Sequence, residues 1–243
     1  MKDNFSTQAA EYAIYRPTYP QELYDYLYSL VKGKSAAWDC ATGNGQVARI
    51  LAQEFEHVYA TDISEKQLSQ ALKLPNITYQ VESSDQTQVP DQSFNLITVA
   101  QAIHWFNFDA FYSEVKRTLK PDGILAVIGY GLMFIDQKVD KSVHKLYQDI
   151  LGKYWDTERR YIEENYKTIP FPFEEVTAPH FQIKTSWTFN QLIGYLNTWS
   201  ALKHYKKANE RNPLEYMFTE LKEAWGNDEV KDVHFPILLR IGK

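Results

Sequence analysis

The stretch from residue 38 to residue 50 constrains the fold more than any other part of the chain. We interpret it as a strand ending in Trp38-Asp39-Cys40, a loop of small residues up to Gly45, and a helix that follows. Small residues recur in such a loop where a ligand must approach the backbone closely. Asp62 lies nineteen residues beyond Gly43 and ends an apolar run, where an adenosine ribose presents its hydroxyls. The pattern predicts a nucleoside cofactor across the carboxyl ends of a parallel sheet.

The loop alone does not identify the nucleoside, because Gly43-x-Gly45-x-x-Ala48 also fits the dinucleotide fingerprint. Asp39 separates the two interpretations. A pyrophosphate near this carboxylate costs about 4 kcal/mol for unit charges about 4 Å apart at a moderate effective dielectric. S-adenosylmethionine has two positive groups, an ammonium and a sulfonium, and only one carboxylate. The negative charge of Asp39 therefore favours its binding. The alternative is that Asp39 only hydrogen-bonds the amides of its own loop.

Composition limits the class of protein. A chain of 243 residues with 44% hydrophobic and 15% aromatic residues forms a packed core, and its apolar runs are too short to cross a bilayer. The polar N-terminus lacks a signal core, and the lone Cys40 fits a reducing cytoplasm. A net charge of −5 argues against a nucleic-acid or anionic-membrane surface, so we expect a small-molecule substrate.

Periodicity predicts an α/β fold with a doubly wound, Rossmann-like sheet. Strands and helices alternate from residue 36 to 129, and the apolar runs 96–100 and 124–128 are typical of central parallel strands. A helix is expected from Asn190 to about Lys206. The runs 181–189 and 233–241 alternate like antiparallel strands, with Pro236 indicating a bulge or an edge. We expect one domain, with an N-terminal lid (1–20), a cofactor-binding core (21–130), a helical cap insertion (131–180) and C-terminal strands and helices (181–243).

Further candidates follow the third and fourth strands. Asp85 can accept a hydrogen bond from an adenine amino group, or it is a turn residue in solvent. His104 and Trp105 follow the end of a buried strand. At this place they either line a pocket or pack against the cap. The Trp105 ring can hold a sulfonium by cation–π attraction, and His104 is a candidate general base.

The tyrosine-rich segment 12–20 is the predicted lid. Arg16 is a candidate partner for the cofactor's carboxylate, and Tyr12, Tyr15 or Tyr19 for the methyl group. The alternative is a segment packed on the surface with Arg16 in solvent. The histidines show no metal-ligand spacing, and the nucleophile elbow G-x-S-x-G is absent.

Four stretches together carry a family resemblance: YAIYRPTYP (12–20), DCATGNG (39–45), AQAIHW (100–105) with LKPDG (119–123), and GYLNTWS (194–200). The chain resembles class I S-adenosylmethionine-dependent methyltransferases of the small-molecule, trans-aconitate-type branch. This resemblance implies a seven-stranded sheet whose last strand is antiparallel. Ala41 stands where the family usually has its first glycine, which implies mild crowding by one methyl group.

The resemblance, with the reasoning above, gives two sets of candidate residues. The cofactor-binding set is Arg16, Asp39, Ala41, Gly43, Gly45, Asp62, Ile63, Ser84, Asp85, Ala100 and Gln101. The substrate-pocket set is Tyr12, Tyr19, His104, Trp105, Tyr130 and Trp199. The helical spacing of Trp199 by itself indicates core packing, whereas the resemblance implies that Trp199 faces the acceptor pocket.

We therefore predict an enzyme that transfers a methyl group from S-adenosylmethionine to a small-molecule acceptor such as a carboxylate. The enzyme mainly aligns donor and acceptor and excludes water, so no catalytic nucleophile is expected. A carboxylate needs no base, whereas a hydroxyl or amine requires His104 or a lid tyrosine to take a proton. The alternatives are an NAD(P)-dependent oxidoreductase and a non-catalytic S-adenosylmethionine-binding protein.

Overall fold

The computed structural model describes residues 15–243, which form one seven-stranded sheet and the helices around it. The strand order is β3-β2-β1-β4-β5-β7-β6. The strands are β1 (Ala36–Cys40), β2 (His57–Asp62), β3 (Ile77–Val81), β4 (Phe94–Ala100), β5 (Leu119–Tyr130), β6 (Gln182–Trp187) and β7 (Lys231–Gly242). The first five strands are parallel, and β7 is antiparallel to both of its neighbours. The predicted Rossmann-like sheet with an antiparallel last strand is confirmed.

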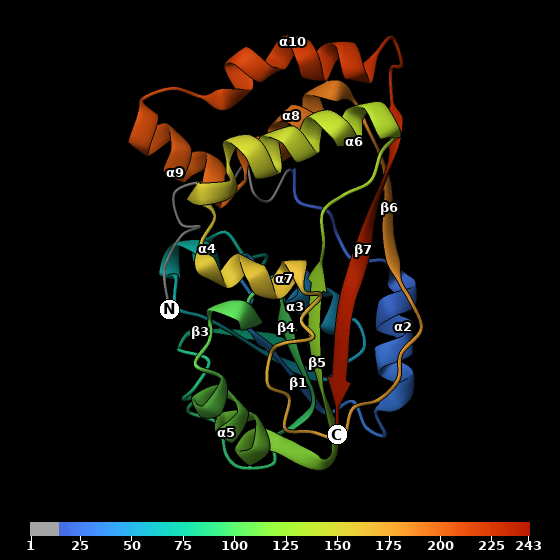
Figure 1. Ribbon diagram of the computed structural model, residues 1–243. Helices are drawn as coiled ribbons and strands as arrows, with labels where there is room; N and C mark the ends of the chain where they lie inside the picture. Colours follow the sequence, from blue (N-terminus) through green and yellow to red (C-terminus); the bar gives the residue numbers. More distant parts are fainter. Residues whose placement is uncertain (1–14) are drawn as a thin grey trace.

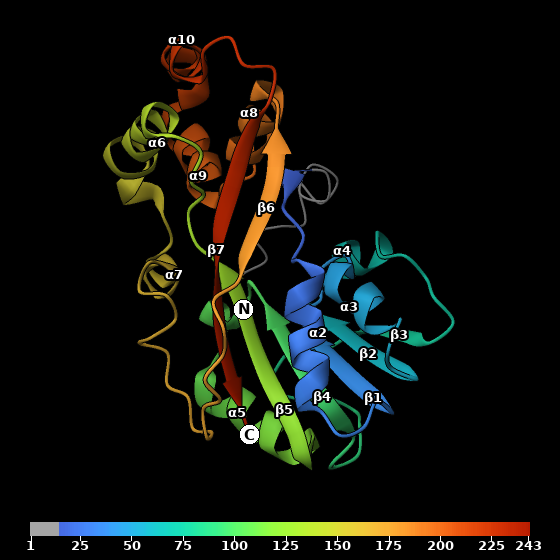
Figure 2. The ribbon, with the colours of Figure 1, turned by 90° about the vertical axis from the view of Figure 1, so that its right-hand side faces the viewer.

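Helices cover both faces of the sheet (Figure 2). One face carries α2 (Gln21–Leu30) and α3 (Gln46–Leu51), and the other carries α5 (Phe108–Thr118). The short α4 (Glu65–Ser69) follows β2. Six of the seven residues of β4 are buried, as expected of a central strand covered on both sides. This packing fixes the carboxyl ends of β1, β2 and β4 relative to one another.

A second layer of helices, here called the cap, lies beyond the carboxyl ends of the parallel strands (Figure 1). It consists of α6 (Gln137–His144), the π-helical turn η3 (Lys145–Ile150), η4 (Gly152–Tyr154), α8 (Phe189–Asn197), α9 (Ser200–Asn209) and α10 (Pro213–Trp225). These helices enclose their own buried cluster, which includes Leu146, Leu192 and Trp225. The cap is therefore built from two separate stretches, 137–154 and 189–225.

Short elements connect the cap to the sheet. These are η2 (Ile103–Trp105) after β4, then η5 (Thr157–Arg159) and α7 (Arg160–Glu163) below η4. The strand β7 spans both layers, because residues 231–236 pair with β6 and residues 237–242 pair with β5. Pro236 is thus not at an edge: it lies where β7 changes partner, and its carbonyl accepts a hydrogen bond from Gly131. No helix among residues 15–243 is both long and apolar enough to span a membrane.

Candidate active site

The loop between β1 and α3 adopts left-handed backbone conformations. The φ angles are +55° at Ala41, +57° at Gly43 and +78° at Gly45. A Cβ atom added to Gly43 meets no atom within 4 Å, whereas one added to Gly45 lies 2.5 Å from the hydroxyl of Tyr79. Gly43 therefore borders open space, and Gly45 is required by the packing of Tyr79.

Asp39 lies beneath this loop with only 1% of its surface exposed. One carboxylate oxygen accepts hydrogen bonds from the Thr42 hydroxyl (2.5 Å) and the Ala48 amide (3.0 Å), and the other accepts one from the Thr98 hydroxyl (2.8 Å). Burial raises the pKa of Asp39 to about 6 in spite of these bonds. The two interpretations of Asp39 are therefore compatible, since it holds its own loop and also borders the cavity above it.

Asp62 joins the end of β2 to the glycine loop. Its Oδ2 atom accepts a hydrogen bond from the amide of Gly43, and its Oδ1 atom accepts one from the amide of Ser64, both at 2.9 Å. Ser64 in turn caps α4 by accepting a hydrogen bond from the amide of Gln67. The carboxylate is thus fixed at the mouth of the cavity.

The space above the loop, here called the glycine-loop cavity, has a volume of about 130 Å³. Of the predicted residues it brings together Arg16, Tyr19, Asp39, Ala41, Gly43, Asp62, Ile63, Ala100, Gln101, Trp105 and Tyr130. Sequence reasoning missed eight further lining residues: Pro17, Thr42, Asn44, Gln46, Val47, Ser64, Gln67 and Ala102. The helix-capping pattern at Ser64 was the available signal for two of them.

Three predicted cofactor residues do not line this cavity. Gly45 lies beneath it at the start of α3. Ser84 is buried, and Asp85 is exposed and accepts a hydrogen bond from the Ser83 hydroxyl. Tyr12 lies outside the described residues.

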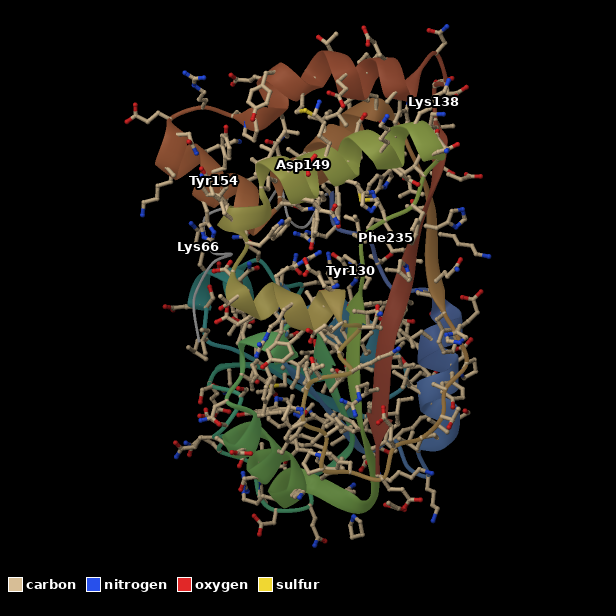
Figure 3. The ribbon with its side chains drawn as sticks, viewed as in Figure 1. Lys66, Tyr130, Lys138, Asp149, Tyr154 and Phe235 are labelled. Carbon is tan, nitrogen blue, oxygen red and sulfur yellow. The ribbon has the colours of Figure 1, made fainter. Side chains whose placement is uncertain are left out.

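Arg16 connects the N-terminal segment to β5 and the cap. It donates hydrogen bonds to the Tyr130 hydroxyl (3.1 Å) and the Thr198 carbonyl (3.2 Å), and it lies 5.2 Å from the centre of the Tyr195 ring. Figure 3 shows Tyr130 between the sheet and the cap, near Phe235 of β7. Arg16 is therefore a partly buried residue of the site, not a solvated one.

A second, smaller space adjoins the first and is here called the inner chamber. It has a volume of about 40 Å³ and shares three residues with the glycine-loop cavity: Arg16, Gln101 and Trp105. Its other lining residues are His104, Trp155, Asp156, Arg159, Ile162, Trp199 and Ser200. His104 and Trp199 are thus placed together as predicted, whereas Trp155, Asp156 and Arg159 were not foreseen.

Two arginine side chains and an indole N–H group border the inner chamber. The indole N–H of Trp105 is buried and finds no hydrogen-bond partner among residues 15–243. The guanidinium of Arg159 lies 4.8 Å from the centre of the Trp155 ring. The chamber is bordered by the guanidinium groups of Arg16 and Arg159 and by one carboxylate, that of Asp156. Its wall therefore has a net positive charge.

His104 is 7% exposed and stands beside the Trp105 ring at a centroid distance of 5.0 Å. Its Nδ1 atom lies 3.4 Å from the hydroxyl of Tyr166. Burial, and next the positive charge of Arg159, lower the pKa of His104 to about 3. The ring is therefore neutral and a weak base at physiological pH.

The fold and the site together define a class of enzyme. A seven-stranded sheet with an antiparallel last strand, a glycine loop after β1 and a carboxylate at the end of β2 is the arrangement expected from the class I methyltransferase resemblance. Residues 38–127, from β1 to β5, match the family model described as a methyltransferase domain. Among residues 15–243 no group of three His, Cys, Asp or Glu side chains is placed to hold a metal ion.

Individual relatives extend the match to the whole chain. A Dictyostelium discoideum protein named as a methyltransferase is 35% identical over 249 residues, covering 99% of this chain and 95% of that protein. Saccharomyces cerevisiae CRG1, named as an S-adenosylmethionine-dependent methyltransferase, is 26% identical, and the match covers 90% of this chain and 89% of that protein. A solved structure described as a type II methyltransferase from Anaeromyxobacter dehalogenans has a TM-score of 0.87 and 38% identity. The match covers 94% of this chain and 97% of that chain.

The chain belongs to the class I S-adenosylmethionine-dependent methyltransferases. It is therefore an enzyme whose methyl donor is S-adenosylmethionine. These comparisons favour neither the oxidoreductase nor the non-catalytic alternative.

Proposed function

We propose that the glycine-loop cavity holds the methyl donor through residues of β1, β2 and β4. The open space over Gly43 leaves room for a ligand against the backbone, which is the fit that a nucleoside cofactor requires. In this proposal Asp62 binds the ribose and Arg16 the donor's carboxylate, and buried Asp39 adds negative charge beneath a cationic ligand. Ala41, Ile63, Ala100 and Gln101 form the walls, Gly45 shapes the loop from below, and Ser84 and Asp85 stay predicted partners of the adenine.

When bound, S-adenosylmethionine supplies a methyl carbon that its sulfonium already activates. The task of the chain is to orient the acceptor and exclude water. Trp105 faces both cavities, and Trp199, only 2% exposed, covers the inner chamber from the cap. Tyr19 and Tyr130 border the glycine-loop cavity on the side of the cap, where they limit access of water.

We further propose that the acceptor is the carboxylate of a small organic molecule, bound in the inner chamber. The observation that carries this proposal is the pair of donors at the chamber wall, the Arg159 guanidinium and the buried indole N–H of Trp105, which finds no hydrogen-bond partner among residues 15–243. A carboxylate satisfies such donors and reaches the site already ionised. It needs no general base, which agrees with a His104 whose pKa is about 3.

The proposal is tested with methyl-labelled S-adenosylmethionine and a set of organic acids. A methyl ester releases labelled methanol in alkali, whereas methyl ethers, methylamines and methyl thioethers do not. We expect an alkali-labile product that passes a small-pore filter. An alkali-stable product, or label retained on a macromolecule, contradicts the proposal.

Arg159→Gln supplies the matched variant for this assay. It keeps polar donors but removes the charge, and we expect kcat/KM for the acid to fall roughly thirtyfold, equivalent to about 2 kcal/mol. The affinity for S-adenosylhomocysteine is expected to stay the same, because Arg159 does not line the glycine-loop cavity.

A further inference from the structure

A third space continues from the inner chamber and is here called the outer cavity. It shares Trp155, Asp156, Arg159 and Ile162 with the inner chamber and has a volume of about 720 Å³. Its other lining residues include Leu132, Phe134, Tyr147, Gly152, Glu163 and Pro236. The three spaces thus adjoin in series, and the glycine-loop cavity shares no lining residue with the outer cavity.

Volume limits what each space can hold. The inner chamber, at about 40 Å³, accommodates a carboxylate or a few water-sized groups. The donor occupies the glycine-loop cavity in the proposed function. The larger outer cavity adjoins the inner chamber, so an acceptor larger than its own reacting group has room to extend into it.

Arg159 stands at the border of the two spaces and is held there by several contacts. Its Nε atom donates a hydrogen bond to the Tyr147 hydroxyl (2.9 Å), and the guanidinium also lies over the Trp155 ring. The Tyr147 hydroxyl in turn donates to Glu163 (2.6 Å), so this carboxylate already has a partner. Arg159 is thereby positioned to bind an anion that reaches the inner chamber from the outer cavity.

The outer cavity also has an apolar wall. Leu132, Phe134, Ile162 and Pro236 line it from β5–α6, α7 and β7. Phe134 is 53% exposed, which is unusual for a phenylalanine. An apolar chain in the cavity would remove this ring from water, which favours binding.

We propose that the outer cavity binds the body of the acceptor, and that this acceptor is an elongated organic acid with an apolar chain. Its carboxylate lies at Arg159 and its chain lies along the wall of Leu132, Phe134 and Pro236. The acceptor arrives through this cavity, on the side away from the glycine loop. This inference rests on the proposed carboxylate methylation, but the binding site can be tested without turnover.

Gly152 offers a way to fill the cavity without strain. A Cβ atom added there meets no atom within 4 Å, and its φ lies outside the left-handed region. Gly152 lines the outer cavity, so we expect the indole of Gly152→Trp to lie in it. Asp149→Trp is the matched control, because Asp149 is exposed, lies three residues earlier and lines none of the three spaces. Figure 3 shows Asp149 in the cap, above Tyr130.

The probe is 11-(dansylamino)undecanoic acid, whose fluorescence is titrated with the full chain saturated by S-adenosylhomocysteine. We expect saturable binding that dodecanoate displaces. Gly152→Trp should raise the Kd of the probe at least about tenfold, whereas Asp149→Trp should leave it unchanged. The Kd of S-adenosylhomocysteine should be the same in all three proteins, which also shows that the variants are folded.

Two results of the binding titration overturn the inference: no saturable binding of the probe, or binding that Gly152→Trp leaves unchanged. The alkali-labile methanol assay separates this failure from failure of the proposed function. A third result also overturns the inference but leaves carboxylate methylation standing. In that result the wild type and Gly152→Trp methylate short acids equally, and neither prefers long acids. Binding that Gly152→Trp blocks, without any labile product, supports the cavity and contradicts carboxylate methylation.

Discussion

The carboxylate of Asp62 accepts a hydrogen bond of 2.9 Å from the backbone N–H of Gly43. This contact ties the end of β2 to the loop after β1. Asp62 therefore fixes the glycine loop in addition to its proposed contact with the donor's ribose.

Asp62→Ala is expected to weaken S-adenosylhomocysteine binding by roughly 10- to 100-fold, since hydrogen bonds to a charged group contribute about 1.5–3 kcal/mol. Isothermal titration calorimetry measures this loss. Glu65→Ala is the control, because it removes an exposed carboxylate three residues away that lines none of the described cavities. Equal affinities of Asp62→Ala and the wild type contradict the assignment.

Asp39 predicts a specific pH dependence of stability. Its pKa is 3.8 ordinarily and about 6 in the folded chain, so the folded state binds the proton more tightly than the unfolded state. As the pH rises through this interval, ionisation of Asp39 lowers the free energy of unfolding by about 3 kcal/mol in total, of which about 2 kcal/mol is lost between pH 4.5 and pH 7.5. Asp39→Asn keeps an oxygen for Ala48 and cannot ionise, so this fall should be absent from the variant.

Urea unfolding of the wild type and Asp39→Asn at pH 4.5, 5.5 and 7.5 measures the difference. Other carboxyl groups contribute equally to both proteins, so only the difference between the two curves reports on Asp39. Parallel curves across this range contradict the raised pKa.

Ala41→Gly is expected to stabilise the chain. Ala41 has a φ of +55°, and a left-handed conformation costs a residue with a Cβ atom about 1 kcal/mol. The reciprocal variant, Gly43→Ala, should destabilise by about the same amount and also weaken S-adenosylhomocysteine binding, because its methyl group points into open space where the ligand is proposed to lie. Thermal unfolding and calorimetry measure the two effects, and destabilisation by Ala41→Gly is the contrary result.

His104→Gln tests the role of the neutral imidazole. Because the pKa of His104 is about 3, replacing it should not change the shape of the kcat/KM profile between pH 6 and 8 for an organic acid. The glutamine keeps a polar group in the chamber, so we expect a loss of less than about tenfold. If the kcat/KM profile of the wild type changes with pH near pH 7 and that of the variant does not, His104 acts as a base, which contradicts this prediction.

The sheet and the glycine-loop cavity follow from local patterns. Continuous apolar runs specify the central strands, and parallel strands bring Asp39, Asp62 and Ala100 to one edge whatever the rest of the chain does. The hydrogen bond from the Thr98 hydroxyl of β4 to Asp39 was not visible in the sequence, because local spacing does not reveal which strand lies beside β1.

The inner chamber was only half predicted because its other wall comes from a distant part of the chain. Trp155, Asp156 and Arg159 follow η4 in a segment without a recognised motif. The helix expected from Asn190 to about Lys206 is likewise two helices, since the backbone becomes extended at Trp199, directly after Thr198, without glycine or proline. The Thr198 hydroxyl donates to the Tyr195 carbonyl, and Arg16 binds the Thr198 carbonyl, so a contact across the molecule marks this break.

Strand β7 has a consequence for how ligands are exchanged. Its first half is bonded to β6 beside the cap, and its second half is bonded to β5 inside the sheet. The two ladders meet at Pro236, so any movement of the cap that admits or releases a ligand has to bend β7 at this residue.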